Sequence, residues 1–353
     1  MIPIIQLGLG GVGRALARQI LAAAPAIRRR YGIDLRYVAL VDSRGALAGD
    51  PSLSDEQVRQ ALAVKEAGSG IDSINGAITE RHWIELLPAA MSIVVDVTAS
   101  GGHAAPLAAA VSAGHRVVLA NKRPLCEGYD LFAALTERGA TRYEATVGAG
   151  LPVIGVLQSM LDSGDEALCI EAALSGTLGF LMSELEAGRS FADAVRTAHR
   201  LGYTEPDPRD DLSGVDVARK ALILARTCGI QLPADAVTAE SLFPAHLETV
   251  SVAEFLDRLD EAEEAIMQRL VAARAANQRL RYVARITAER VEVGLNAVPA
   301  DHPLAGLRGP DNLISFTTRR YYDRPLVVRG PGAGVEVTAA GVLSDIIATA
   351  REL

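Results

Sequence analysis

The fold of this chain is decided near its start by Ile2-Pro3-Ile4-Ile5-Gln6-Leu7-Gly8-Leu9-Gly10-Gly11-Val12-Gly13. The apolar run predicts a buried strand, and residues 14–21 after the glycines are apolar at helical spacing. In such a unit Gly8 permits the tight turn, Gly10 lets a pyrophosphate approach the backbone, and Gly13 allows close helix packing. The order of strand, glycine turn and helix therefore indicates a dinucleotide-binding site.

A second predicted strand, residues 35–41, ends at Asp42, where an acidic side chain would accept a hydrogen bond from the adenine ribose. This position favours NAD. Arg44 would instead pair with a 2′-phosphate, so the choice between NAD and NADP stays open. Further strands are predicted at residues 92–97 and 116–120. We therefore expect an α/β fold with a Rossmann-type, doubly wound parallel sheet and a second α+β domain.

Residues 202–220 bring more carboxylates close to a lysine than any other stretch of the chain. The charged side chains of interest are Glu205, Asp207, Asp210, Asp211, Asp216 and Lys220. Two prolines keep the first half out of helix, and Ser213 then predicts a helix cap that places Asp216 and Lys220 on one helical face. Each residue alone also fits ordinary capping or turn structure. Together they suit a site that receives an ammonium group and moves a proton.

Two other segments are candidates for ligand contacts. Lys122 follows the strand at residues 116–120, and open α/β sheets bind ligands just beyond the carboxyl ends of their strands. A solvated loop lysine is the alternative. Residues 143–152 place Glu144 among small residues whose exposed carbonyls would suit a monovalent cation. From the residues alone, a glycine-rich hinge is the preferred interpretation of this segment.

Taken together, these segments resemble the homoserine dehydrogenase family over nearly the whole chain. The resemblance rests on residues 8–13, 120–122, 144–152, 175–177, 201–220, 302–305, 311–312 and 330–342. It implies reversible reduction of L-aspartate 4-semialdehyde to L-homoserine with NADH or NADPH, in the pathway to threonine, methionine and isoleucine. One departure is Gly179, where many members carry Asn, and it bears on the substrate wall near Thr177.

The resemblance also implies individual roles. The expected catalytic residues are Lys220, Lys122 and Asp216. The expected substrate-binding residues are Glu205, Asp211, Gly176, Thr177 and Tyr203. The expected cofactor-binding residues are Gly8, Gly10, Gly11, Val12, Gly13, Asp42, Ser43, Arg44, Thr98, Ser100, Asn121, Lys122 and Gly332. A monovalent cation, Na or K, is expected at Glu144, Val147, Ala149 and Leu151, the last three through backbone carbonyls.

The chemistry of the implied reaction agrees with a lysine at the centre of the site. A hydride that arrives at an aldehyde carbon leaves negative charge on the oxygen, which needs a nearby cation that can also deliver a proton. Partial desolvation would lower the pKa of such a lysine from its ordinary value of about 10.4, whereas a carboxylate such as Asp216 would raise it. The remaining carboxylates, Glu205 and Asp211, would pair with the α-ammonium of the substrate.

The amino-acid composition is typical of a soluble globular protein. The 353 residues allow two domains, and 49% apolar with 22% charged residues is typical of a globular protein. A net charge of −8 gives no sign of a nucleic-acid-binding face. Three isolated cysteines predict neither a disulfide framework nor a metal site, and no signal peptide or membrane-spanning run is predicted. We therefore expect a cytoplasmic protein that binds neither nucleic acid nor membrane.

The expected domains are a dinucleotide-binding domain at residues 1–147 plus 333–353, a dimerisation sheet at 148–160 plus 279–332, and a catalytic substrate-binding region at 161–278. By resemblance the sheet pairs two subunits into a homodimer. A long helix is predicted at residues 253–276. The length leaves no stretch for an N-terminal kinase or a C-terminal regulatory domain, so we expect the short, monofunctional form of the family.

Two alternatives remain at this point. One is another semialdehyde-linked dehydrogenase that works through a thioester, which would require an activated cysteine beside a base. The other is a catalytically inactive dinucleotide-binding regulator that kept the fold and lost turnover. The lysines and carboxylates of the candidate site argue against the second alternative, and the lack of an obvious histidine partner for any cysteine argues against the first.

Overall fold

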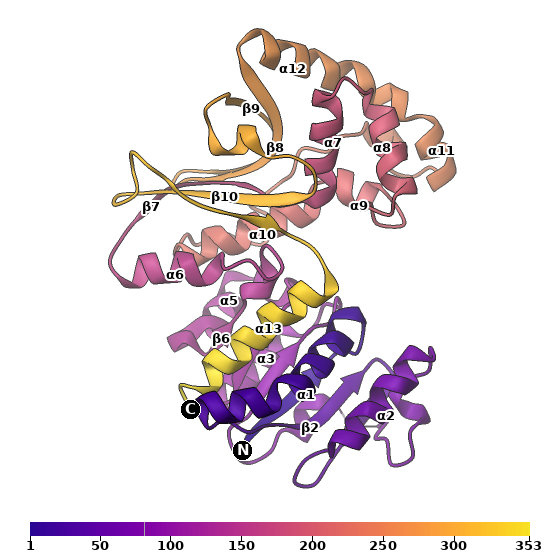
Figure 1. The fold of residues 1–353 in the computed structure, drawn as a ribbon, viewed down its shortest axis with the longest axis vertical. Helices are drawn as coiled ribbons and strands as arrows, with labels where there is room; N and C mark the ends of the chain where they lie inside the picture. Colours follow the sequence, from indigo (N-terminus) through magenta and orange to yellow (C-terminus); the bar gives the residue numbers. More distant parts are fainter. Residues whose placement is uncertain (81) are drawn as a thin grey trace. The chain divides into compact units, whose positions relative to one another are not determined.

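The computed structural model describes residues 1–80 and 82–353 and divides them into two compact units. The first unit comprises Met1–Gly150 and Ala333–Leu353, and the second comprises Leu151–Gly332. Within the described residues, no helix has both the length and the apolar character that crossing a membrane requires. Figure 1 traces the chain through both units.

The first unit is built on a six-stranded sheet with strand order β3-β2-β1-β4-β5-β6. The strands are β1 (Ile2–Leu7), β2 (Leu35–Asp42), β3 (Gly45–Ala48), β4 (Ile93–Asp96), β5 (Arg116–Leu119) and β6 (Thr141–Arg142). All neighbours pair in parallel except β2 and β3, which form an antiparallel hairpin at the edge. The chain order reverses direction across β1 and β4, which is the doubly wound arrangement that the sequence predicted.

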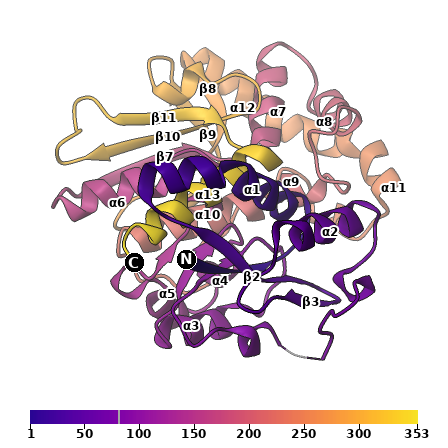
Figure 2. The same ribbon diagram turned by 60° about the horizontal axis from the view of Figure 1, so that its bottom comes forward.

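Helices cover both faces of this sheet. They are α1 (Gly11–Tyr31), α2 (Asp55–Glu66), α3 (Ala104–Ser112), α4 (Arg123–Cys126), α5 (Tyr129–Thr136) and α13 (Val335–Ala350). Figure 2 shows α1 and α13 side by side on one face, with α3 and α5 on the other. Leu16 and Ile20 of α1 and Val342 and Ile346 of α13 are buried in the same core as the strands. The end of the chain therefore completes the unit that its beginning starts.

The second unit contains a five-stranded antiparallel sheet with strand order β11-β10-β7-β8-β9. The strands are β7 (Ala167–Ala173), β8 (Gln278–Ile286), β9 (Val291–Pro299), β10 (Asp311–Thr318) and β11 (Leu326–Pro331). The helices are α6 (Ile154–Asp162), α7 (Gly176–Glu186), α8 (Phe191–Arg200), α9 (Arg209–Leu212), α10 (Val215–Thr227), α11 (Val252–Asp257) and α12 (Glu263–Ala275). A parallel sheet in one unit and an antiparallel sheet with helices in the other confirm the predicted fold class.

Three local features differ from the sequence-based expectations. The central strand β7 was not predicted, because Ala-Leu-Cys-Ile-Glu-Ala-Ala is rich in alanine, which strands disfavour. The helix predicted at 253–276 is divided into α11, a 3₁₀ turn at Leu259–Ala262 and α12. This division lets Phe255 and Leu259 both lie fully buried.

The segment before α10 also differs. The proline-containing stretch forms the short helix α9, because Pro208 occupies the N-cap position, where its missing N–H costs no helical hydrogen bond. The N-cap of α10 is Gly214 in left-handed conformation, not Ser213 as predicted. The hydroxyl of Ser213 donates to the carbonyl of Asp210. The same hydroxyl accepts from the N–H of Val215 over 3.4 Å. Ser213 therefore stabilises the turn between the two helices.

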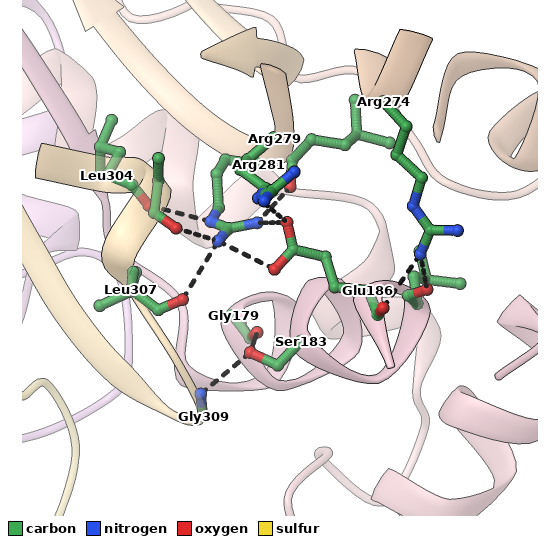
Figure 3. A network of polar contacts seen from close by, with 12 residues as sticks. Gly179, Ser183, Glu186, Arg274, Arg279, Arg281, Leu304, Leu307 and Gly309 are labelled. Atoms are coloured by element: carbon green, nitrogen blue, oxygen red, sulfur yellow. Dashed lines mark hydrogen bonds and ion pairs between the residues drawn. The ribbon is translucent and has the colours of Figure 1, made fainter. Parts of the chain in front are cut away.

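Arg281 of β8 holds three elements of the second unit together (Figure 3). Its guanidinium forms an ion pair with Glu186 at the end of α7, with two N···O distances of 2.8 and 3.2 Å. It also donates to the carbonyls of Leu304, Ala305 and Leu307, which belong to or follow the 3₁₀ turn η7 (Pro303–Gly306). The residue is 2% exposed, so these acceptors have little water to replace the arginine.

We expect Arg281→Met to destabilise the second unit by about 3 kcal/mol, because it leaves the Glu186 carboxylate and several buried carbonyls unpaired. Arg279→Met is the matched control, since its side chain lies on the same strand but is 44% exposed, and it should change stability by about 0.5 kcal/mol or less. Urea unfolding followed by circular dichroism measures both. Equal unfolding midpoints for the two variants would contradict this assignment.

Candidate active site

A cavity of about 550 Å³ opens in the first unit at the carboxyl ends of β1, β2 and β4. Its lining residues are Leu7, Gly8, Leu9, Gly10, Arg14, Val41, Asp42, Ser43, Lys65, Gly68, Ser69, Trp83, Thr98, Ala99, Ser100 and His103. The predicted cofactor residues among them are Gly8, Gly10, Asp42, Ser43, Thr98 and Ser100. The cavity lies where open α/β sheets bind dinucleotides.

The backbone around the glycines fits a bound pyrophosphate. Gly8 has a φ of +100°, a conformation that residues with a side chain rarely adopt. A side-chain carbon at Gly13 would overlap the carbonyl of Gly8, so the start of α1 can approach β1 only because this residue is glycine. Nothing lies within 4 Å of a side-chain carbon built at Gly10, and the first turn of α1 carries no acidic residue. The N-terminus of α1 is therefore open and electrostatically suited to a phosphate.

Asp42 lies at the adenosine end expected from the motif, but its carboxylate is already fully engaged. One oxygen accepts from the N–H groups of Arg44 and Gly45 at 2.8 and 3.1 Å. The other accepts from the ammonium of Lys65 at 2.8 Å and from the N–H of Ile71 at 3.0 Å. Burial by itself would raise the pKa of Asp42, but these donors, Lys65 first, lower it. Asp42 is thus a neutralised anion whose lysine partner faces the cavity.

At the other end of the cavity, the fully buried Asp96 organises the loops that follow β4 and β5. Its carboxylate accepts from the N–H of Thr98 at 2.9 Å and from the side-chain amide of Asn121 at 3.0 Å. The ring of His103 lies 3.1 Å from the same carboxylate. The hydrogen bond to Asp96 raises the pKa of His103, which favours a positive charge in the wall of the cavity.

Ten lining residues were not among those predicted, and four of them carry charged or aromatic side chains: Arg14, Lys65, Trp83 and His103. Lys65 lies 23 residues after Asp42 with no motif to connect them, and only the fold brings α2 beside the end of β2. Other predicted cofactor residues do not line this cavity: Gly11, Val12, Gly13, Arg44, Asn121 and Lys122. Gly13 and Asn121 nevertheless shape it, by close helix packing and by side-chain hydrogen bonds from Asn121 to Thr98 and to the carbonyl of Ser100.

In the second unit, Lys220 on α10 is buried and held by two acceptors. Its ammonium donates to the carbonyl of Leu174 at 2.6 Å and pairs with Asp216, one helical turn earlier, at 2.8 Å. Leu174 directly follows β7, so the lysine ties the helix to the end of the sheet. The predicted placement of acid and base on one helical face is therefore present in the structure.

Thr177, in the first turn of α7, joins two predicted substrate residues. Its hydroxyl lies 2.6 Å from the carbonyl of Tyr203 and 2.9 Å from a carboxylate oxygen of Asp211. The second oxygen of Asp211 accepts from the N–H of Glu205 at 2.8 Å. Burial raises the pKa of Asp211, and the charges of Asp210 and Asp216 act in the same direction. A cationic ligand beside Asp211 would relieve this repulsion.

The other acidic residues of the segment fall into two groups. Glu205 and Asp210 are exposed, which leaves Glu205 accessible to a ligand. Asp207 instead forms an ion pair with Arg209, whose guanidinium also donates to the carbonyls of Leu247, Glu248 and Val250. Asp207 and Arg209 therefore secure the segment against the chain near residue 250. The residue pattern alone did not distinguish this structural carboxylate from its neighbours, although the family resemblance gave it no role.

Three remaining predicted residues are Lys122, Gly332 and Gly176. Lys122 is the N-cap of α4 in the first unit, three residues after the end of β5, and is partly buried. Gly332 is the last residue of the second unit and packs against the buried side-chain amide of Asn312 so closely that a side-chain carbon would overlap it. Gly176, which begins α7, lies against the carbonyl of Pro310. Both glycines are thus explained by close packing.

The predicted cation segment folds into a compact turn. Glu144 begins a short 3₁₀ turn, Val147 is fully buried, and Ala149 has a φ of +57°. Leu151 is the first residue of the second unit. The N–H of Glu144 donates to Asp345 of α13 at 2.9 Å. Excluding Arg81, no group of three or more His, Cys, Asp or Glu side chains is arranged to hold a metal ion, so a cation here would depend on carbonyl ligands.

Two family models match this chain. The model described as homoserine dehydrogenase matches residues 152–347, and the model described as homoserine dehydrogenase, NAD binding domain, matches residues 8–144. A homoserine dehydrogenase from Emericella nidulans is 36% identical over 373 residues, with 98% of each chain covered. A chloroplastic bifunctional aspartokinase/homoserine dehydrogenase 1 from Zea mays is 39% identical over 97% of this chain, which spans 37% of the length of that relative.

The fold is also shared with solved structures. A hyperthermophilic archaeal homoserine dehydrogenase in complex with NADPH aligns with a TM-score of 0.73 and 27% identity, over the whole of this chain and 98% of its own. A Candida auris protein of unknown function aligns with a TM-score of 0.86 and 33% identity, over 98% of this chain and 97% of its own. The similarity therefore extends over both units of the chain.

Asp345 provides a test of the turn around Glu144 through the pH dependence of stability. Burial raises the pKa of Asp345 from its ordinary 3.8 to about 7, against the lowering effect of the hydrogen bond from the Glu144 N–H. Between these two pKa values the folded state holds a proton that the unfolded state releases. The stabilisation that comes from the protonated Asp345 is therefore fully present below pH 3.8 and is lost as the pH rises toward 7. Asp345→Asn keeps an acceptor for the Glu144 N–H but cannot ionise.

Between pH 5 and 7, we expect wild type to lose about 2 kcal/mol of unfolding free energy relative to Asp345→Asn. Chemical unfolding at several pH values measures the difference. Parallel pH profiles for the two proteins would show that Asp345 does not change its protonation in this range.

Proposed function

The chain belongs to the homoserine dehydrogenase family, and from this we propose that it catalyses reversible hydride transfer between L-homoserine and L-aspartate 4-semialdehyde, with NADH or NADPH. The reaction would serve the synthesis of threonine, methionine and isoleucine. The observation that carries the proposal is the buried Lys220 ammonium, held by Asp216 and the Leu174 carbonyl next to the Thr177 and Asp211 pair.

In the proposed reaction Lys220 stabilises the developing alkoxide and supplies its proton. A buried ammonium close to the aldehyde oxygen acts in a medium of low dielectric constant, where its attraction for negative charge is stronger than in water. Asp216 keeps the ammonium oriented along α10, and its own side chain is half exposed, so it is also placed to exchange protons with solvent. When bound, the reduced nicotinamide supplies the hydride.

The α-ammonium of the amino-acid substrate is assigned to Asp211 and Glu205. Asp211 is held in place by Thr177 and by the N–H of Glu205, so its carboxylate is oriented before a ligand arrives. Burial opposes ionisation of this carboxyl, and an adjacent ammonium would restore it. Tyr203, whose carbonyl lies close to the Thr177 hydroxyl and whose ring packs against Phe180, would bound the same site.

The cofactor assignment uses residues of the first unit. The pyrophosphate is assigned to the N-terminus of α1, with Gly8, Gly10 and Gly13 permitting its approach. We propose that NADPH is preferred, because Asp42 has no oxygen left for the ribose and Lys65 offers positive charge beside it. Lys122 is proposed as a second lysine of the active site, and Asn121 as the residue that fixes its loop.

Further proposals follow the family more closely. Glu144 with the carbonyls of Val147, Ala149 and Leu151 is proposed to bind a monovalent cation, supported by the buried turn around Glu144. The antiparallel sheet is proposed to form a homodimer, supported by the exposed Val327 on its edge strand β11 and by Tyr322 in the adjoining hairpin. A cytoplasmic location agrees with three cysteines that form no disulfide.

The two alternatives are less well supported by the structure. Burial raises the pKa of Cys228 to about 12 and also raises the pKa of Cys169, the reverse of what a thioester-forming nucleophile requires. A catalytically inactive regulator would not need a buried lysine with two fixed acceptors. Dinucleotide binding without turnover on the semialdehyde would nevertheless favour that regulator.

We expect purified protein to oxidise NADPH and NADH when L-aspartate 4-semialdehyde is added in sodium or potassium buffer, as followed by the absorbance of the reduced cofactor. Lys220→Met keeps the length of the side chain and removes its charge, so kcat should fall by about 100-fold or more with a smaller change in KM. Asp210→Asn is the control on an exposed neighbour and should retain kcat within about threefold. Wild-type turnover in Lys220→Met would exclude this lysine as the proton donor.

Cofactor preference gives a separate test of the Asp42 and Lys65 pair. Lys65→Ala removes the positive charge and leaves Asp42 unneutralised, so it should raise KM for NADPH by about tenfold or more and leave KM for NADH within about threefold. Steady-state kinetics with both cofactors measure the ratio, with Arg59→Ala, an exposed position on the same helix, as the control. An equal change for both cofactors would mean that Lys65 does not contact the 2′-phosphate.

A further inference from the structure

A second cavity of about 480 Å³ lies in the second unit, beside the C-terminal half of α7, and Figure 3 labels Ser183, Glu186, Arg274 and Arg279 of its lining. Its lining residues are Ser183, Glu186, Ala187, Gly188, Arg274, Arg279 and Arg308. On α7, Thr177 lies six residues before Ser183 and nine before Glu186, which is about 9 and 14 Å along the helix at 1.5 Å per residue. The cavity is therefore distinct from the proposed substrate site.

The cavity is lined by three arginines and a single carboxylate, so its walls carry an excess of positive charge. Glu186 is the one acidic lining residue, and both of its oxygens are taken by the buried Arg281 behind the wall. Arg279 approaches the same carboxylate only at 3.7 Å. Three lining arginines and the buried Arg281 thus accompany one lining carboxylate, in a chain whose net charge is −8. The local charge of the cavity is therefore positive, although the net charge of the protein is negative.

The three lining arginines differ in how they are held. Arg274 donates to the carbonyls of Leu185 and Glu186, both at 3.0 Å, and so caps the last turn of α7. Arg308 directly follows Leu307, whose carbonyl is fixed by Arg281, and its own side chain is exposed. Within residues 1–80 and 82–353, no carboxylate forms an ion pair with Arg308. Arg274 is therefore oriented by neutral carbonyl acceptors, Arg279 has a long ion pair with Glu186, and the exposed Arg308 can turn toward a ligand.

Ser183 adds a fixed polar group to the wall and ties it to the loop that carries Arg308. Its hydroxyl donates to the carbonyl of Gly179 and accepts from the N–H of Gly309 at 2.9 Å. Arg308 is thus bounded on one side by Leu307 and on the other by Gly309, each with a fixed backbone group. The loop holds its place before any ligand binds, which lowers the entropic cost of binding.

We propose that this cavity binds a phosphate group, either as inorganic phosphate or as the terminal group of a small phosphate monoester. Guanidinium forks match phosphate oxygens in pairs, and a dianion offsets more of the surplus charge than a single carboxylate would. The lining offers little apolar surface for a larger organic group, because its only residues without a polar side chain are the small Ala187 and Gly188. The proposal concerns binding alone and does not depend on the proposed enzyme activity.

The test is isothermal titration of the full chain with inorganic phosphate and, separately, with glycerol 3-phosphate, in chloride buffer at fixed ionic strength. Arg279→Ala/Arg308→Ala removes two exposed guanidinium groups and should weaken binding by about tenfold or more. Arg290→Ala is the control, because this arginine of the same unit is 64% exposed and lies outside the cavity, and it should bind as wild type does. Arg308→Glu, a single charge reversal at an exposed position, should abolish detectable binding.

The outcomes separate the possible sources of the signal. Tighter binding of the monoester than of phosphate supports a phosphorylated metabolite, and the reverse order supports the free ion. Equal affinity of wild type and the double variant would place the phosphate elsewhere, such as at the N-terminus of α1, and would overturn the proposal. Absence of binding to wild type would also overturn it and would leave the arginines as solvated side chains or as contacts for an acidic protein surface.

Discussion

The second unit depends on the burial of one lysine ammonium. A buried charge is tolerated only where fixed acceptors replace water, and Lys220 finds them in Asp216 of its own helix and in the carbonyl of Leu174. Leu174 lies between β7 and α7, so this requirement fixes α10 against the end of the sheet and the start of α7. Thr177 and the Asp211 that it contacts are positioned by the same junction.

Buried carboxylates have the corresponding effect in the first unit. Asp42 and Asp96 end two strands of the parallel sheet, and each accepts hydrogen bonds from the loop that follows it. Asp42 also recruits Lys65 from α2, while Asp96 holds Asn121 from the loop after β5. The dinucleotide cavity is therefore shaped by anions that the protein itself neutralises. What remains exposed to a ligand is the positive end of α1 and the cationic partners.

Sequence patterns predicted those parts of the molecule that local physics controls. The glycines near residue 10 and the spacing of Asp216 and Lys220 express backbone and helix geometry, which a short stretch of sequence contains. Lys65 and the strand β7 were missed because their roles depend on neighbours distant in the chain. Asp207 shows the same limit, since only the carbonyls near residue 250 reveal its Arg209 partner as structural.

The arginines around α7 show that even residues of the same type, close together in the chain, take different roles when their distant neighbours differ. Arg279 and Arg281 are two positions apart on β8, so they lie on the same face of a strand and have the same chemistry. Arg281 is buried because Glu186 and three carbonyls of the turn after β9 enclose it, whereas Arg279 lies next to the start of the strand and its side chain is 44% exposed. A buried arginine with every donor satisfied stabilises the fold, and because Glu186 pairs closely with Arg281, its carboxylate offsets little of the charge of the other arginines. The structural role of one arginine thereby determines the binding potential of the others.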